Sequence, residues 1–313
     1  ENNCLASMFI MMNFDRLTLG LHGIGGAVLA YQNATAYTLD RIQGRADSGI
    51  QEPNKAADPI VFHADVRRML LNAKTISEAS RCFAMYVAKE LDTNKYTDDA
   101  AARKAADDRV ALLTPVAKAF LTDRGLEASI DAQQCFGGHG YIREWGMEQI
   151  VRDTRISQIY EGTNGIQSLD LLGRKVVKNG GAFVTTYVQE MRDFANNMNA
   201  DHAIKQAILT SADKLEDLTK AVVAAAAVNK DEINGCAVDY LQAFGYVSFA
   251  YMFGLMVEAA NGKEGDFYAN KAKLANYYVG RMLPRLDAHI AMVKATSQPI
   301  TAFDRDYFAA TIA

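Results

Sequence analysis

Proline is scarce in this sequence, with five residues in 313, and no run of about 18 uncharged apolar residues occurs. The lack of such a run predicts that the chain has no membrane span. The four cysteines form no CxxC pair, and none stands with histidine at zinc-ligand spacing. This predicts no metal site and reduced thiols, as in a cytoplasmic protein. The chain begins without methionine, directly in a helical pattern, so we expect a fragment or a processed product.

An excess of one charge sign is also missing, because the formal net charge is only -4. The charge balance therefore gives no reason to expect a nucleic-acid partner. The motifs GxGxxG, HExxH, GxSxG and the lysine-containing phosphate loop are all absent, which leaves a dinucleotide fold unsupported. Half of the residues are hydrophobic, and the length is sufficient for two domains of a globular protein.

Helical periodicity is the strongest pattern that is present. Apolar residues recur at spacings of three and four and predict helices over about 5–45, 61–91 and 105–136. Residues 46–59 carry two prolines and several polar residues, which predicts a loop. Pro115 lies inside the third helix, where we expect a kink or a break. No alternating strand pattern occurs at any length, so the predicted fold class is all-α.

Glycine clusters divide the second half of the chain. The run Gly137-Gly138-His139-Gly140 predicts a turn, and the charged segment up to Arg155 has no regular pattern. A helix resumes near Ile166 and should end at Asn179-Gly180-Gly181, a helix C-cap signal. We therefore expect one domain over 1–180 and a second over 181–313. The second should hold four or five helices, with breaks near Asp201, 229–231 and 261–266.

Glu161 is the most informative carboxylate in the sequence. It stands between Tyr160 and Gly162, and the nearby Ile156 and Ile159 predict an apolar surround. Loss of water from such a place should raise the pKa of the carboxylate toward the range useful for a general base. Gly162 lets a ligand approach the backbone, and the Thr163 hydroxyl could bond a polar cofactor. The alternative is structural, with Glu161 as a cap of the helix near Ile166.

Two long stretches resemble the signature of the acyl-CoA dehydrogenase family. Residues 134–141 read QCFGGHGY, and residues 152–167 read RDTRISQIYEGTNGIQ, in the family's order. The helix from Arg16 to Arg41 resembles the helix that carries the family's substrate-side and flavin-side arginines. Phe62-His63 resembles the start of the next helix. The resemblance covers about residues 1–178 and implies the family's C-terminal helical bundle.

Residues 181–313 resemble the extra helical domain of large bacterial acyl-CoA dehydrogenases, the group that includes 3-methylmercaptopropionyl-CoA dehydrogenase. The segment GDFYANK at 265–271 and the helix after it carry this weaker match.

The resemblance assigns roles residue by residue. Glu161 would be the catalytic base, and Asn13, Arg16 and Gly162 would lie on the acyl-CoA side. The residues assigned to the cofactor FAD are Arg41, Gln43, His63, Gln134, Gly137, Gly138, Thr163 and Gly165. Two departures concern the flavin contacts: Ile42-Gln43-Gly44-Arg45 follows Arg41 in place of xxFG, and Gly165 stands where smaller members carry glutamine.

Structural alternatives stand beside these roles. Arg16 and Arg41 could form ion pairs on a helix surface, and His63 could be a satisfied structural histidine. The glycines could serve only to form a turn.

The reaction implied by the resemblance is α,β-dehydrogenation of an acyl-CoA to the trans-2-enoyl-CoA, with an electron-transfer flavoprotein as acceptor. The family places an all-α and a β domain before this bundle, so we expect the chain alone to bind flavin poorly and to be inactive. The glycine turn would serve the flavin of a neighbouring subunit, which implies a homodimer or a higher oligomer. The alternatives are an acyl-CoA oxidase and a non-enzymatic flavoprotein or DNA-associated scaffold on the same fold.

Overall fold

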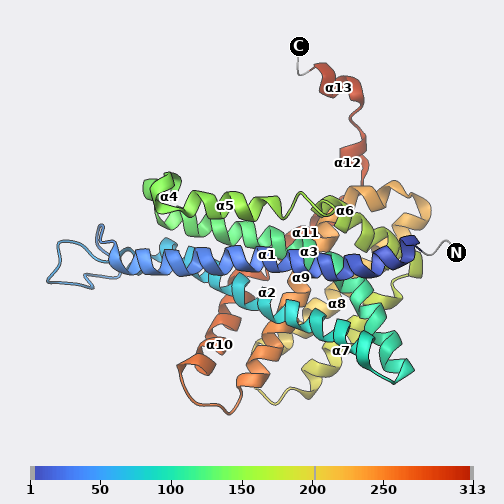
Figure 1. Ribbon diagram of the computed structural model, residues 1–313, viewed down its shortest axis with the longest axis horizontal. Coiled ribbons are helices and arrows are strands. Elements are labelled where there is room, and N and C mark those ends of the chain that lie inside the picture. The colour runs from blue at the N-terminus through green and yellow to red at the C-terminus, as the bar shows by residue number, and fades with distance from the viewer. Residues whose placement is uncertain (1–3, 201, 311–313) are drawn as a thin grey trace. The chain divides into compact units, whose positions relative to one another are not determined.

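The computed structural model describes residues 4–200 and 202–310, and their regular secondary structure is helical. Figure 1 draws coiled ribbons and no arrow, and only one isolated bridge, between Ile42 and Pro59, occurs in these residues. The predicted all-α fold class is confirmed. The described residues divide into two compact units, and the long helices α2 (Ala64–Tyr96) and α3 (Ala100–Cys135) contribute to both.

The first unit comprises the chain up to Tyr86 together with Ala117–Thr163. Its first helix, α1, spans Cys4–Asp40 and therefore ends about five residues before the predicted end. The reason is that Gln43 and the residues after it hydrogen-bond across the loop to Asp58, so the backbone leaves the helix.

Helix α3 contains Pro115 without ending there, so the expected break is absent. The residues around the proline, from Leu112 to Thr122, are buried. Tertiary packing therefore compensates for the one hydrogen bond that proline removes, because most helix stability in proteins comes from packing.

The segment expected to be irregular before Arg155 is instead a short 3-10 turn, Arg143–Trp145, and a regular helix α5, Met147–Ile156. The prediction failed because the charges lie on one exposed face, where Arg152 Nε donates to Glu148 at 2.7 Å. Such a pair, four residues apart, supports a helix. The buried side of α5 carries Met147 and Thr154.

Close packing explains two of the three glycines of the HGIGG stretch on α1, Gly23 and Gly26. A Cβ on Gly26 would lie 2.1 Å from Thr154 Oγ1 of α5, and a Cβ on Gly23 would lie 2.5 Å from the Leu121 carbonyl oxygen of α3. Neither contact tolerates a side chain, so these glycines bring three helices together. The core beside them is formed by Ala30, Ala34, Met69, Leu70, Ala132, Cys135, Phe136 and Met147.

The second unit comprises Val87–Val116 and the chain from Asn164 onward. Helix α6 (Asn164–Leu169) continues as a wide π turn (Asp170–Val176) and a 3-10 turn (Val177–Asn179). The chain then turns at Gly180 and Gly181, whose φ angles are 64° and 84°, where the sequence predicts a helix end.

Five longer helices and two short ones follow in this unit. They are α7 (Ala182–Asn197), α8 (Ile204–Val228), α9 (Asp231–Ala260), α10 (Asp266–Tyr277), α11 (Arg285–Lys294), α12 (Gln298–Thr301) and α13 (Arg305–Ala310). The predicted breaks near 229–231 and 261–266 are present, and Asp201 lies outside the described residues.

Among the described residues one helix, α9, is long and apolar enough to cross a membrane by length and composition. However, 72% of its apolar window is buried inside the protein. Tyr240, Phe244 and Phe249 on this helix are fully buried. A core helix passes the same test, so α9 is weak support for a span.

Candidate active site

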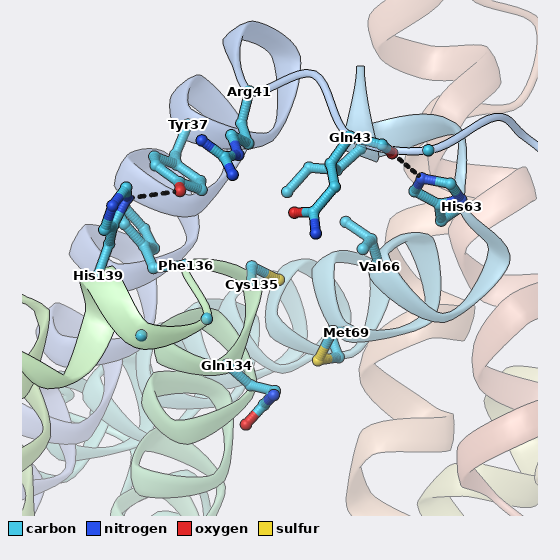
Figure 2. Close-up of a pocket in the computed structure, with 14 residues that line it drawn as sticks. Tyr37, Arg41, Gln43, His63, Val66, Met69, Gln134, Cys135, Phe136 and His139 are labelled. Carbon is cyan, nitrogen blue, oxygen red and sulfur yellow. Dashed lines mark hydrogen bonds between the residues drawn. The ribbon is translucent and has the colours of Figure 1, made fainter. Parts of the chain in front are cut away.

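A pocket of about 760 Å³ lies in the first unit, between the end of α1, the start of α2 and the glycine turn after α3. Six of the eight residues that the sequence assigns to a cofactor line it: Arg41, Gln43, His63, Gln134, Gly137 and Gly138. Figure 2 shows Arg41 and Gln43 extending from the end of α1 and the loop after it, with Val66 and Met69 on α2. Residues almost 100 positions apart in the sequence therefore share one cavity.

The chemistry of the lining suits an anionic, aromatic-containing ligand. The 14 described lining residues include one arginine, two histidines and two glutamines but no carboxylate. Arg41 is exposed and forms no ion pair with a described residue, so the alternative of surface ion pairing is not supported. Its guanidinium is available to a phosphate, which it can bind in a bidentate manner.

The glycine turn is sterically open on the pocket side. Gly137 has φ 56°, a conformation that glycine adopts without strain. The turn itself therefore favours glycine at this position. In addition, a Cβ built on Gly137 or Gly138 would meet no atom within 4 Å. This open space allows a ligand to approach the backbone closely, and the two interpretations of these glycines are compatible.

Two histidines are fixed by hydrogen bonds at the pocket wall (Figure 2). His63 Nε2 donates to the Gln43 carbonyl oxygen at 2.7 Å, and this bond ties α2 to the loop after α1. His139 Nδ1 lies 2.9 Å from Tyr37 Oη, and its ring stacks on Trp145 with centroids 4.7 Å apart. His63 thus has the structural partner that the alternative interpretation expects, and it also faces the pocket.

Asp58 organises the loop that carries Arg41 and Gln43 into the pocket. Its carboxylate accepts the backbone N–H groups of Ala46, Gln51 and Glu52 at 2.8–3.0 Å and the Arg45 guanidinium at 3.2 Å. Burial raises the pKa of Asp58, but these hydrogen bonds outweigh burial and hold the pKa at about 2. No sequence pattern indicates this role of Asp58.

Glu161 lies in the turn between α5 and α6, and its backbone has φ 54°. This left-handed conformation is costly for a residue with a side chain, and such strain concentrates at functional sites. Because α6 begins at Asn164, the residue directly before this helix is Thr163, two positions after Glu161. The described residues do not form the expected apolar enclosure: Glu161 is exposed, and Ile156 and Ile159 are 46% and 48% exposed.

Two side-chain hydrogen bonds hold the residues just before Glu161. Tyr160 Oη lies 2.7 Å from His22 Nδ1 on α1, and Gln158 Nε2 donates to Asp123 Oδ1 on α3 at 2.7 Å. All four residues belong to the first unit.

A buried lysine interacts electrostatically with both Glu161 and Arg16. Lys118 is fully buried, and burial lowers its pKa to about 8. The positive charge of Arg16 also lowers this pKa, whereas the negative charges of Asp123 and Glu161 raise it. These charges therefore act on one another within the first unit. Arg16 is only 8% exposed, so its side chain is buried and does not lie on the helix surface.

The remaining predicted site residues lie outside the pocket. Asn13 is half-buried on α1, one turn before Arg16, and Gly162 is exposed with φ 81° directly after Glu161. Thr163 and Gly165 are exposed and do not line the pocket described above. No sequence pattern assigns Tyr37, Phe136 and His139 to the pocket, because hydrogen bonds and stacking between distant residues leave no local pattern.

Comparison with known proteins identifies the family. Residues 6–176 match the model of the acyl-CoA dehydrogenase C-terminal domain, and residues 187–304 match the model described as acetyl-CoA dehydrogenase C-terminal like. The chain belongs to the acyl-CoA dehydrogenase family. It is 32% identical over 312 residues to 3-methylmercaptopropionyl-CoA dehydrogenase of Ruegeria pomeroyi, which covers 96% of this chain and 52% of that protein. The chain thus spans about half the length of the curated relatives it matches.

Solved structures share the fold. An acyl-CoA dehydrogenase of Bacillus anthracis complexed with FAD matches 99% of this chain and 52% of its own, with a TM-score of 0.69 and 17% identity. Acyl-CoA oxidase-1 of Caenorhabditis elegans, complexed with FAD and ATP, matches 89% of this chain and 44% of its own, with a TM-score of 0.65 and 17% identity. The fold is therefore common to dehydrogenases and oxidases.

Proposed function

We propose that this chain is the base-carrying part of an FAD-dependent acyl-CoA dehydrogenase, which converts an acyl-CoA to the trans-2-enoyl-CoA. The observation that carries the proposal is the gathering of six predicted cofactor residues in one pocket free of carboxylates. Family membership supplies the reaction class.

The pocket residues fit the phosphate and adenosine parts of FAD. Arg41 would pair with a phosphate, and Gln43 and Gln134 would bond polar groups of the nucleotide. The open space over Gly137 and Gly138 would admit the ligand next to backbone N–H groups. When bound, FAD supplies the acceptor for the hydride that leaves the β-carbon of the substrate. Thr163 and Gly165 do not line this pocket, and we propose that they contact the cofactor near Glu161.

Glu161 is proposed to remove the α-proton. Its side chain is exposed on a turn, so a substrate can reach it, and the flanking Gly162 leaves room beside the backbone. The N–H of Glu161 donates to no described residue, so it is available to the thioester oxygen, where a donor would stabilise the developing negative charge. Arg16 and Asn13 are proposed to line the acyl-CoA side of the same region, and Gly162 to let the thioester approach.

The complete protein tests the proposal. Anaerobic mixing with acyl-CoAs of short, medium and long chain, and with 3-methylmercaptopropionyl-CoA, should bleach the flavin absorption with at least one substrate. If no acyl-CoA bleaches a flavin that is bound, the enzymatic proposal fails and a non-enzymatic scaffold is favoured. The presence of Glu161 in an accessible turn argues against that scaffold.

An acyl-CoA oxidase is the second candidate, because a solved oxidase shares the fold with a TM-score of 0.65. The two are separated by admitting oxygen after anaerobic reduction. Rapid reoxidation with production of hydrogen peroxide would identify an oxidase. Slow reoxidation that an electron-transfer flavoprotein accelerates would identify a dehydrogenase, which is our proposal.

Three further points belong to the proposal. We place the domain boundary between residues 180 and 181, which falls in the interval between the two family matches. We propose a homodimer or a higher oligomer in which the glycine turn serves the cofactor of a neighbouring subunit. We also propose a cytoplasmic enzyme with an acyl-CoA substrate and with neither a nucleic-acid partner nor a membrane span.

A further inference from the structure

The turn that carries Glu161 has little regular structure of its own. Helix α5 ends at Ile156 and α6 begins at Asn164, so residues 157–163 belong to neither. Two successive residues in this turn, Glu161 and Gly162, have positive φ angles of 54° and 81°. A left-handed residue with a side chain persists only where its surroundings hold it, so the turn needs anchors.

Two anchors precede the base, at alternate positions. Tyr160 Oη lies 2.7 Å from His22 Nδ1, and Gln158 Nε2 donates to Asp123 Oδ1 at 2.7 Å. His22 lies on α1 and Asp123 on α3, the two helices that pack closely at Gly23 through the Leu121 carbonyl. The turn is therefore hydrogen-bonded on both sides of Ile159, at Gln158 to α3 and at Tyr160 to α1.

The geometry of the first anchor is specific. The phenol O–H of Tyr160 donates to His22 Nδ1 when that nitrogen carries no proton. The bond joins residues 138 positions apart, and the residue after Tyr160 is the proposed base. Loss of the bond would let the Tyr160 side chain rotate away and the next residue leave its left-handed conformation.

The bond contributes little to folding, because both partners are accessible: His22 is exposed and Tyr160 is half-buried. An exposed hydrogen bond has a small net effect on stability. If this bond is purely structural, its loss should have small effects on both stability and catalysis. If it positions Glu161, its loss should slow catalysis and leave stability nearly unchanged.

We propose that His22 is a positioning residue of the enzyme: through its hydrogen bond to Tyr160, and together with the Gln158–Asp123 bond, it holds the turn that aims the Glu161 carboxylate at the substrate. This inference rests on the proposed function of Glu161. His22 does not touch the reacting atoms and acts through Tyr160 alone.

The test uses the complete protein and four variants: His22→Leu, Tyr160→Phe, their combination and His22→Gln. The rate of anaerobic flavin reduction and the KM for acyl-CoA are measured for each. His22→Leu and Tyr160→Phe should each slow reduction about 10-fold with little change in KM, because a small misplacement of a reacting group is costly. The double variant should be no slower than the slower single variant, because both changes remove one bond.

His22→Gln provides the rescue, because its carboxamide oxygen can accept the Tyr160 O–H. It should recover most of the parent rate. Asn33→Ala is the control, since it removes another exposed side-chain bond of α1, from Asn33 Nδ2 to the Leu29 carbonyl oxygen at 2.8 Å. The control should reduce flavin at the parent rate.

The outcomes separate this inference from the function it rests on. If Glu161→Gln is inactive but His22→Leu reduces flavin at the parent rate, the positioning role is wrong and the base stands. Additive losses in the double variant, or a raised KM for Tyr160→Phe alone, would show that Tyr160 acts without His22 and would also overturn the inference. If Glu161→Gln is itself active, the proposed function fails first.

Discussion

Tyr37 Oη lies 2.9 Å from His139 Nδ1, and this hydrogen bond joins α1 to the glycine turn across 102 positions of sequence. The Tyr37 ring also stacks on Phe136, with centroids 4.1 Å apart, and the His139 ring stacks on Trp145. Tyr37, Phe136 and His139 form one wall of the pocket that we assign to FAD, and Trp145 supports the His139 ring. Arg41 follows on the same helix end, one turn after Tyr37, so the wall places the arginine beside the pocket.

We predict that Arg41→Gln weakens FAD binding by the complete protein by roughly 10- to 100-fold. The reason is the loss of a charge-assisted hydrogen bond, which contributes about 1.5–3 kcal/mol. Quenching of flavin fluorescence on binding measures the dissociation constant. Arg152→Gln is the matched control, because Arg152 is exposed and pairs with Glu148 outside the pocket. Equal affinities for the parent and Arg41→Gln would remove Arg41 from the site.

We predict that Asp58→Asn both weakens FAD binding and destabilises the loop at neutral pH. An amide cannot accept from all four donors that surround the carboxylate, so the backbone from Ala46 to Glu52 loses partners. Flavin fluorescence reports the first effect, and denaturant unfolding at several pH values reports the second.

The pH dependence of the Asp58 effect has a definite sign. Hydrogen bonds depress the folded-state pKa from 3.8 to about 2, so the carboxylate stabilises the fold fully above pH 3.8. The stabilisation is lost as the pH falls from 3.8 through 2. The difference in unfolding free energy between parent and Asp58→Asn should be constant from pH 7 to 5 and shrink toward pH 3. A difference that grows at low pH would contradict this assignment.

The sequence predicted the all-α class, because periodicity is local. The family motifs assign Arg41, His63 and Gln134 to FAD, which stays a prediction, and only the structure shows that the three line one pocket. The sequence could not predict the anchors at Asp58 and His22, because a single hydrogen bond between distant residues leaves no pattern. The apolar surround of Glu161 was wrong for a related reason. Ile156 and Ile159 are near Glu161 in sequence, but in a turn neighbouring side chains point in different directions, and both are exposed.

We predict that the parent gains stability relative to Lys118→Met as the pH rises above 8. Burial depresses the folded-state pKa of Lys118 from 10.5 to about 8, although the charges of Asp123 and Glu161 oppose this shift. As the pH rises from 8 to 10.5 the folded state releases this proton while the unfolded state keeps it, so the unfolding free energy of the parent increases. The unfolding free energy of Lys118→Met should not show this increase.

Denaturant unfolding of both proteins at pH 7, 8, 9 and 10 measures this difference. Lys104→Met is the control, because Lys104 is an exposed residue that pairs with Asp108 one turn later on the same helix. It should show no such change of stability difference with pH. If the parent loses stability relative to Lys118→Met above pH 8, the pKa of Lys118 is not depressed in the folded state.

The last prediction concerns Glu161 itself. Glu161→Gln keeps the size of the side chain and one carbonyl oxygen, but it removes the proton acceptor. A positioned general base is worth roughly 10²- to 10⁴-fold in rate, so anaerobic flavin reduction by acyl-CoA should slow by at least about 10³-fold. FAD and acyl-CoA binding should persist, because Glu161 does not line the FAD pocket and its backbone N–H, the proposed partner of the thioester oxygen, is unchanged. Glu161→Asp should give an intermediate rate, since its carboxylate falls about one methylene short of the α-carbon. Stopped-flow bleaching of the flavin gives all three rates. Reduction by Glu161→Gln within a few-fold of the parent would place the base elsewhere, and complete loss of flavin from this variant would assign Glu161 a structural role in the turn.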